Sequence, residues 1–401
     1  MTTRWLTLIG IGEDGFVSEA ARQVLAEAEV VYGSARHFEL VDCIDGKQKT
    51  WPSPFSGVYD ELNALRGKPV TVLATGDPQW YGIGSTLART FAPDEIRVLP
   101  APSAFQLAAA RLGWALQDVE TISLHGRPVE TLSGFLYPGA KILALTSNGE
   151  TPETVANLLT AQGYGQSRVT VLEHMGGDKE RVVSGHADGW DQAVADFNTL
   201  ALEITADPGT AFRPRVPGLA DDAFVHDGKM TKREVRAVTL AQLMPHPGAL
   251  LWDIGLGCGS IAIEWMRSAR GARAIGLEPN ADRRGLASEN ALALGVPGLD
   301  IRDATAPDGL NGLPSPDAIF IGGGLTADSI VDACHDALKP GGRLVANAVT
   351  LEGETVLLDA HRRFGGGLTR ISVERAGAVG GLTGWRPLMP VTQWHLIKEA
   401  D

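Results

Sequence analysis

The sequence reads Asp253-Ile-Gly-Leu-Gly-Cys-Gly259 where a short apolar stretch, 249–254, gives way to the stretch 260–266. The apolar stretch predicts a buried strand, and the stretch after the glycines predicts a helix. Glycines at alternate positions let the backbone turn sharply and approach a ligand closely. The motif is typical of a strand–loop–helix unit in a nucleotide-binding α/β sheet, although a glycine loop alone is weak support.

The same alternation of strands and helices begins twice along the chain. Later strands are expected at 272–278, 298–302, 317–321, 343–347, 371–375 and 391–398. An earlier series has expected strands at 5–10, 70–74, 96–99, 141–146, 168–172 and 200–204, and helices at 18–28, 103–112 and 152–162. Between the series, three prolines and two glycines in 207–218 cannot continue a helix or a central strand. We therefore expect an α/β protein with domains at 1–210 and 220–401 and a linker at 211–219. A long surface loop within one domain is the alternative.

Acidic residues follow the glycine loop at regular intervals. Glu278 stands 25 residues after Asp253, and Asp303, beside Ala304, stands another 25 residues on. An acid at the end of the second strand can accept hydrogen bonds from both ribose hydroxyls of an adenosine. Gly322–Gly324 then follow the fourth strand. These strand ends predict a nucleotide crevice, and an NAD(P) domain or a sheet without a ligand are the alternatives.

This arrangement resembles the class I, Rossmann-like methyltransferase fold that binds S-adenosylmethionine (SAM). The segment 227–236, together with Gly322–Gly324, resembles the family of decarboxylating precorrin-6B C15-methyltransferases, and the resemblance covers about 220–401. It implies a cofactor site made of Thr231, Asp253, Gly255, Leu256, Gly257, Cys258, Gly259, Glu278, Asp303, Ala304 and Gly322. A structural alternative makes Thr231 a helix N-cap, with Glu234 completing a capping box.

The first half carries a different set of loops. Gly10-Ile-Gly12 ends the first strand, Gly76-Asp-Pro78 follows another, and Pro102-Ser-Ala-Phe105 opens a helix. These motifs resemble the tetrapyrrole (corrin/porphyrin) methylases, the class III methyltransferases, whose two α/β lobes hold SAM between them. The resemblance assigns the cofactor to Gly76, Asp77, Ser103 and Ala104. Asp77 as a turn residue and Ser103 as a helix N-cap are the structural alternatives.

A fusion of these two folds is similar to the two-domain methyltransferases of cobalamin biosynthesis. The resemblance implies one SAM per domain and a precorrin-6 substrate. It implies methylation at C5 by the first domain, and methylation at C15 with loss of the ring C acetate carboxyl by the second. It also implies a homo-oligomer, either a dimer or a tetramer. The sequence identifies no catalytic residue, and we expect Lys232, Arg233 or Arg236 at the rim of the pocket that holds the substrate carboxylates.

Composition narrows the remaining classes of function. The 401 residues are 44% hydrophobic and 21% charged, with a formal net charge of −13 and no apolar run long enough for a membrane span. We expect a soluble cytoplasmic protein without a membrane or nucleic-acid partner. The three widely separated cysteines predict neither a zinc site nor a disulfide framework, so no metal is expected. A SAM-dependent RNA methyltransferase with an accessory first domain, or a scaffold with one inactive domain, remain alternatives.

Overall fold

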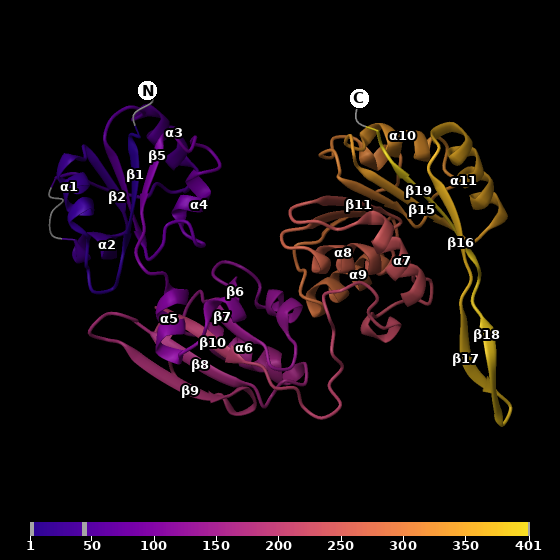
Figure 1. The fold of residues 1–401 in the computed structure, drawn as a ribbon, viewed down its shortest axis with the longest axis horizontal. Helices are drawn as coiled ribbons and strands as arrows, with labels where there is room; N and C mark the ends of the chain where they lie inside the picture. Colours follow the sequence, from indigo (N-terminus) through magenta and orange to yellow (C-terminus); the bar gives the residue numbers. More distant parts are fainter. Residues whose placement is uncertain (1–3, 42–45, 400–401) are drawn as a thin grey trace. The chain divides into compact units, whose positions relative to one another are not determined.

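The computed structural model describes residues 4–41 and 46–399 (Figure 1). The chain forms two compact units, and each is described by itself. One unit comprises Met1–Val129 and Pro138–Thr210, and the other comprises Glu130–Tyr137 and Ala211–Asp401. None of the helices in the described part of the chain is long and apolar enough to span a membrane.

The first lobe of the first unit is a parallel sheet with the strand order β3-β2-β4-β1-β5. All six residues of β1 are buried, as expected for a parallel strand covered on both faces. The strands are β1 (Leu6–Ile11), β2 (Val30–Gly33), β3 (Gln48–Thr50), β4 (Val70–Thr75) and β5 (Ile96–Leu99). The helices are α1 (Glu19–Glu27), α2 (Ala35–Leu40), α3 (Gly57–Ala64) and α4 (Ile83–Leu87).

The second lobe of this unit is a mixed sheet with the order β6-β7-β10-β8-β9. Only β6 and β7 pair in parallel, and the other neighbours are antiparallel. The strands are β6 (Glu120–Ser123), β7 (Lys141–Leu145), β8 (Arg168–Glu173), β9 (Arg181–His186) and β10 (Asn198–Glu203). The helices are α5 (Ala104–Leu112), which packs on β7 and β10, and α6 (Thr151–Ala161).

The second unit is built on a seven-stranded sheet with the order β13-β12-β11-β14-β15-β19-β16. Strands β13 to β15 pair in parallel, and β19 joins antiparallel to β15 and β16. The strands are β11 (Leu250–Ile254), β12 (Arg273–Leu277), β13 (Asp300–Arg302), β14 (Ala318–Ile321), β15 (Arg343–Ala348), β16 (Gly367–Ile371) and β19 (Val391–Ile397). The helices are α7 (Arg233–Leu243), α8 (Ser260–Ser268), α9 (Ala281–Ala293), α10 (Ile330–Ala337) and α11 (Leu351–Phe364). The buried strand β11 lies between two apolar clusters, one on each face of the sheet.

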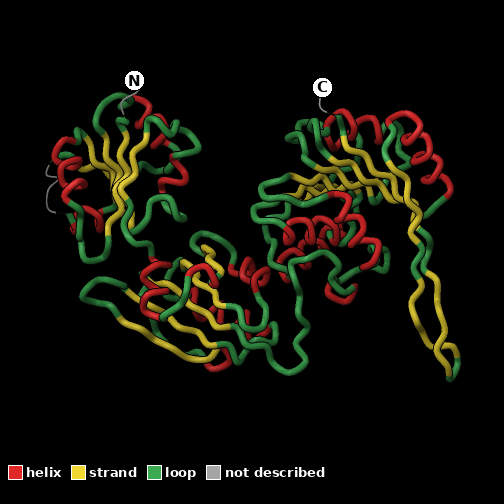
Figure 2. The backbone as a smooth tube through the Cα atoms, viewed as in Figure 1, coloured by secondary structure: helices red, strands yellow, loops and turns green. Residues whose placement is uncertain are grey.

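A two-stranded hairpin, β17 (Glu374–Val379) and β18 (Leu382–Pro387), leaves this sheet between β16 and β19. In Figure 2 its two yellow strands project beyond the rest of the second unit. Its two strands pair only with each other. The hairpin therefore adds nothing to the core of its own unit.

The structure confirms the predicted α/β class, with two lobes in the first unit and a mostly parallel sheet in the second. The strand expected at 371–375 is wrong, because β16 ends at Ile371 and β17 begins at Glu374. Strands β2, β3, β6 and β9 and the hairpin were not predicted. Cys258 and Cys334 are buried and free, whereas Cys43 lies outside the described residues.

Candidate functional site

The glycine loop of the second unit lies at the carboxyl end of β11. Gly255, Gly257 and Gly259 have φ of +74°, +57° and +84°, a region that residues with a side chain rarely adopt. The N–H groups of Gly255 and Leu256 both donate to the Leu277 carbonyl at 3.1 Å, which ties the loop to the end of β12. The sequence therefore needs glycine here to make a narrow turn between strand and helix.

The loop after β14 lies directly against this turn. The N–H groups of Gly322 and Gly323 donate to the Ile254 carbonyl at 2.9 and 3.1 Å. A Cβ on Gly322 would lie 2.6 Å from the Phe320 ring, so a side chain at Gly322 would collide with it. The structure thus brings the predicted Gly322 together with the glycine loop.

Asp253 anchors the helix that follows the loop. Its carboxylate is buried, and Oδ2 accepts a hydrogen bond from the Ala262 N–H at 3.1 Å. The N-cap residue of α8 is Gly259, which has no side chain, so Asp253 replaces the missing cap from the preceding strand. The pKa of Asp253 is raised to about 8, mainly by burial and also by the nearby Glu278 charge, while the Ala262 hydrogen bond opposes the shift.

Glu278 points back into the glycine loop from the end of β12. Its Oε2 accepts from the Gly257 N–H at 2.9 Å, and its Oε1 accepts from the Asn280 N–H at 3.1 Å. Each carboxylate oxygen has a second lone pair that can accept another hydrogen bond. The buried Glu278 therefore fits a diol such as the ribose of SAM.

Leu256 and Cys258 turn their side chains into the core. A Cβ placed on Gly276 would collide with the Leu256 side chain, and Cys258 is buried with its pKa raised by desolvation. The Cys258 carbonyl accepts from Asn290 Nδ2 at 2.9 Å. These two residues can contribute to a ligand site only through their backbone.

Asp303 and Ala304 lie at the end of β13. Asp303 Oδ2 is 2.8 Å from Arg284 Nη2, although 71% of the Asp303 side chain is exposed. Arg284 also donates to the Glu278 and Pro279 carbonyls at 2.9 and 2.8 Å. The arginine therefore links the two acidic strand ends, and a contact of Asp303 or Ala304 with adenine stays a prediction.

The structure corrects the expected start of α7. The N-cap residue is Lys232 rather than Thr231, and the Lys232 side chain does not cap the helix. Asp221, from an earlier segment, instead accepts from the Arg233 N–H at 2.9 Å. Glu234 does not form a capping box, because its carboxylate pairs with Arg375 at 2.6 Å. Thr231, half-buried, contributes its carbonyl, which accepts from Arg236 Nη1 at 2.7 Å. The long-range ion pair takes the carboxylate that a local cap would need.

Arg236 is not at the rim of a pocket, as was expected, but fully buried. Its Nε donates to Glu264 at 2.6 Å, and its Nη2 donates to the Leu219 carbonyl. Glu264 also accepts from the Gly218 and Leu219 N–H groups at 2.6 and 3.0 Å. The pair ties residues 218–219 to α7 and α8, so Arg236 is satisfied and structural.

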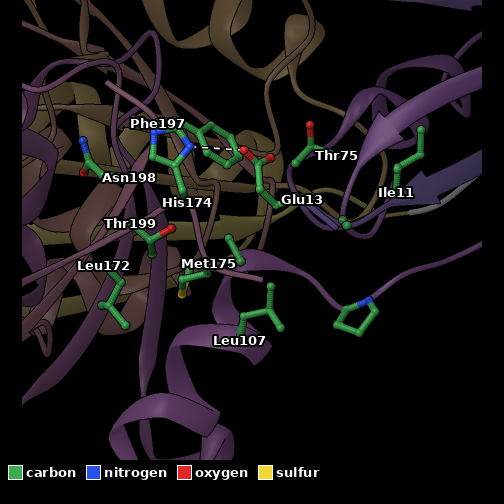
Figure 3. A pocket seen from close by; sticks show the side chains of 14 residues that line it. Ile11, Glu13, Thr75, Leu107, Leu172, His174, Met175, Phe197, Asn198 and Thr199 are labelled. Carbon is green, nitrogen blue, oxygen red and sulfur yellow. Dashed lines mark hydrogen bonds and ion pairs between the residues drawn. The ribbon is translucent and has the colours of Figure 1, made fainter. Parts of the chain in front are cut away.

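The first unit contains a pocket lined by residues of both its lobes (Figure 3). Two of the four predicted residues, Gly76 and Ala104, line it. Gly76 has φ of +63°, and its N–H donates to the Ile11 carbonyl at 2.8 Å. Further lining residues are Ile11, Gly12, Glu13, Thr75, Pro102, Leu107, Leu172, His174, Met175, Phe197, Asn198 and Thr199.

Asp77 and Ser103 are not among the residues that line this pocket. Asp77 Oδ1 accepts from the Gln79 N–H at 2.8 Å, a turn that leaves its other oxygen available. Ser103 caps α5 with both hydrogen bonds of a capping box, to and from Gln106. The structural alternatives for both residues are therefore present, and their contact with a cofactor stays a prediction.

Sequence reasoning missed the polar residues of this pocket. Glu13 follows Gly12 directly, so its position after the glycine pair was the one available signal. His174 and Phe197 follow β8 and precede β10, where isolated residues carry no motif. Only the pairing of the two lobes brings these three side chains together (Figure 3).

Comparison with known proteins identifies both halves of the chain. Residues 6–189 match the tetrapyrrole (corrin/porphyrin) methylases, and residues 222–398 match the precorrin methyltransferase domain.

A precorrin-6Y C(5,15)-methyltransferase (decarboxylating) from Sinorhizobium sp is 52% identical over 98% of this chain and 96% of its own length. The protein of the same name from Mycobacterium tuberculosis (strain ATCC 25618 / H37Rv) is 41% identical over 98% of this chain and 100% of its own. A solved C-terminal domain of precorrin-6Y C5,15-methyltransferase from Rhodobacter capsulatus is 45% identical, covers 46% of this chain and 100% of its own, and has a TM-score of 0.44. The chain therefore belongs to the family of decarboxylating precorrin-6Y C5,15-methyltransferases.

Proposed function

We propose that this chain methylates a precorrin-6 intermediate at C5 and C15 and removes the ring C acetate carboxyl, using one SAM in each unit. Family membership supports SAM-dependent methylation and decarboxylation in cobalamin biosynthesis. The observation that supports two reactions is that each unit brings together its own set of predicted site residues. In the second unit Glu278 bonds the glycine loop, and in the first unit Gly76 and Ala104 line a pocket.

We assign C15 methylation and decarboxylation to the second unit and C5 methylation to the first. The match of residues 222–398 to the precorrin methyltransferase domain supports the first assignment. The match of residues 6–189 to the tetrapyrrole methylases supports the second. We further assign SAM contacts to all fifteen predicted site residues, with Leu256, Cys258 and Thr231 acting through backbone atoms.

The bound cofactor supplies an electrophilic methyl group, so neither unit needs a nucleophilic side chain. In the second unit, Glu278 holds the ribose, and the glycine loop allows the backbone to approach the ligand. The protein must hold the acceptor carbon in line and exclude water, which together can supply most of the acceleration. Decarboxylation leaves an electron pair that the conjugated macrocycle accepts.

The anionic substrate needs cations near the crevice of the second unit. Lys232 and Arg233 begin α7 within the segment that resembles the C15-methyltransferases. Neither side chain has a carboxylate partner among the described residues. With Arg236 excluded by its burial, these two residues are the ones we assign to the substrate carboxylates.

We also propose that the chain is a cytoplasmic homo-oligomer, a dimer or a tetramer. The β17–β18 hairpin exposes large apolar side chains and contributes nothing to its own core. Arg375 anchors the base of the hairpin through Asp221 and Glu234, but a two-stranded hairpin gains little stability from its own pairing, so covering its apolar side chains would stabilise it. A second copy of this chain offers the same apolar surface and can bury both at once.

Calorimetric titration of the full-length protein with SAM tests this function. Wild-type protein should bind two SAM molecules per chain, and Glu278→Leu and Gly76→Val should each remove one. Product mass spectra should then show that Gly76→Val adds one methyl group and still loses carbon dioxide. A single wild-type site, or methyl transfer to tRNA instead of the corrinoid, would contradict the proposal.

A further inference from the structure

A glutamate and a histidine from different lobes of the first unit meet at its pocket (Figure 3). Nδ1 of His174 lies 3.1 Å from Oε1 of Glu13. Glu13 follows β1 in the first lobe, and His174 follows β8 in the second. Both line the pocket, so this hydrogen bond joins the two lobes where a ligand would lie between them.

His174 is held in an unfavourable backbone conformation. Its φ is +45°, which is uncommon for a residue other than glycine. Its N–H donates to the Phe197 carbonyl at 3.2 Å, and its ring lies 5.5 Å from the Phe197 ring. Such strain persists only where neighbours enforce it, and it clusters at functional sites. The backbone here directs one imidazole toward Glu13 and the pocket.

Charged side chains on both sides of His174 are fixed by ion pairs with arginines. Glu13 also pairs with Arg36, whose guanidinium lies 4.0 Å from the centre of the Phe197 ring. On the side of β8, Glu173 is held by Arg181 at 2.6 Å. A carboxylate at Nδ1 places the proton on that nitrogen and leaves Nε2 as the basic atom. Nε2 of His174 has no hydrogen-bond partner among the described residues.

No other lining residue could serve as a base. Of the fourteen that line the pocket, only Glu13 and His174 are titratable, and Glu13 is already engaged by Arg36 and His174. The remaining wall is largely apolar, with Leu107, Leu172 and Met175 among its members. Within the described part of the chain, His174 is therefore the one lining residue that offers a basic atom without a partner to a proton released in the pocket.

We propose that His174 is the catalytic base of the first unit and that Glu13 positions it. The proposal rests on the proposed C5 methylation. When the C5–CH3 bond forms and the S–CH3 bond breaks, C5 still carries its hydrogen and the macrocycle gains one positive charge. Nε2 of His174 takes that proton, and the C–H electron pair restores the conjugated double bond. Glu13 stabilises the imidazolium that results.

The test uses the full-length protein with His174→Gln, His174→Ala and Glu13→Gln. Glutamine can still donate a hydrogen bond to Glu13 but cannot take a proton. The matched control is His186→Gln, because exposed His186 also hydrogen-bonds through Nδ1, to Gln166, but lies outside the pocket. Thermal unfolding and calorimetric SAM binding are measured beside methylation at each carbon.

His174→Gln should unfold and bind SAM like the wild type, yet methylate C5 about 100-fold more slowly or worse. C15 methylation by the same molecules should be unchanged, and imidazole should partly restore C5 methylation in His174→Ala only. Glu13→Gln should fall between wild type and His174→Gln. Normal C5 methylation in His174→Gln, or a rate loss matched by lost SAM binding, would overturn the proposal. If wild-type protein itself fails to methylate C5, the proposed function fails instead.

Discussion

Gly255 and Gly323 touch backbone to backbone where the ends of β11 and β14 meet. A Cβ on Gly255 would lie 2.6 Å from both the nitrogen and the Cα of Gly323, closer than such atoms ever approach. Gly255 also has φ of +74°. The close approach of the two loops thus depends on two glycines that occupy each other's side-chain space.

Gly255→Ala should therefore displace the Gly323 loop and abolish SAM binding by the second unit. The left-handed conformation alone costs alanine about 1–2 kcal/mol. The collision with Gly323 adds a displacement of the loop that would contact the ligand. Thermal unfolding and calorimetric titration of the full-length protein measure the two effects separately.

Gly248→Ala is the matched control for this experiment. Gly248 precedes the same strand and has φ of +77°, but a Cβ there would meet nothing within 4 Å. It should show the stability loss without the loss of SAM affinity. Equal SAM affinities in the two variants would mean that the contact between Gly255 and Gly323 does not shape the crevice.

Asp253 should make the second unit less stable as the pH rises from about 4 to about 8. Its pKa is raised from 3.8 to about 8 in the folded protein, so across this window the unfolded chain loses the proton and the folded protein keeps it. The unfolded state then binds fewer protons, and the free energy of unfolding falls with increasing pH. Asp253→Asn removes this dependence, so its melting temperature relative to wild type should rise across the window.

Glu289→Gln controls for the loss of one acidic group, because Glu289 is exposed on α9. Its melting temperature should follow the wild type at every pH. Calorimetric scans of the full-length proteins at several pH values give the comparison. A difference between Asp253→Asn and wild type that stays constant with pH would contradict the shifted pKa.

The sequence predicted those parts of the site that are local in the chain. Asp253 lies in the strand that leads directly into the glycine loop, and Glu278 follows the loop after one helix and one strand. Strand spacing therefore placed them at one edge of the sheet. The start of α7 was misjudged because Glu234 pairs with Arg375, 141 residues away. No local sequence pattern predicts an ion pair between residues so far apart in the chain.

In the first unit, contacts between residues far apart in the sequence limit prediction even more. Gly76 and Ala104 were found through motifs that follow their strands, whereas His174 was not. Its importance comes from Glu13, 161 residues earlier in the chain, and from a positive φ that no sequence pattern predicts. The hairpin was missed because its side chains are mostly exposed, so burial imposes no alternation of apolar and polar residues on it.

The double variant Lys232→Ala/Arg233→Ala should raise the KM for the precorrin at the C15 step about tenfold. Each substitution removes a cation that would make a charge-assisted hydrogen bond to a substrate carboxylate. SAM affinity should be unchanged. The control is Arg270→Ala/Arg362→Ala, because both arginines are exposed and Arg270 lies at the opposite end of the parallel strands. An unchanged KM in the first variant would remove both residues from the substrate site.

Leu382→Ser/Trp385→Ser should reduce the assembly to a smaller species, measured by light scattering during size-exclusion chromatography. These side chains are 79% and 72% exposed on a hairpin that contributes nothing to its own core, so replacing them removes apolar surface without opening a cavity. The two substitutions themselves should therefore not lower the melting temperature of a single chain. Leu351→Ser is the control, because Leu351 is 78% exposed at the start of α11, away from the hairpin. If the double variant keeps the wild-type mass, the hairpin does not hold copies of this chain together.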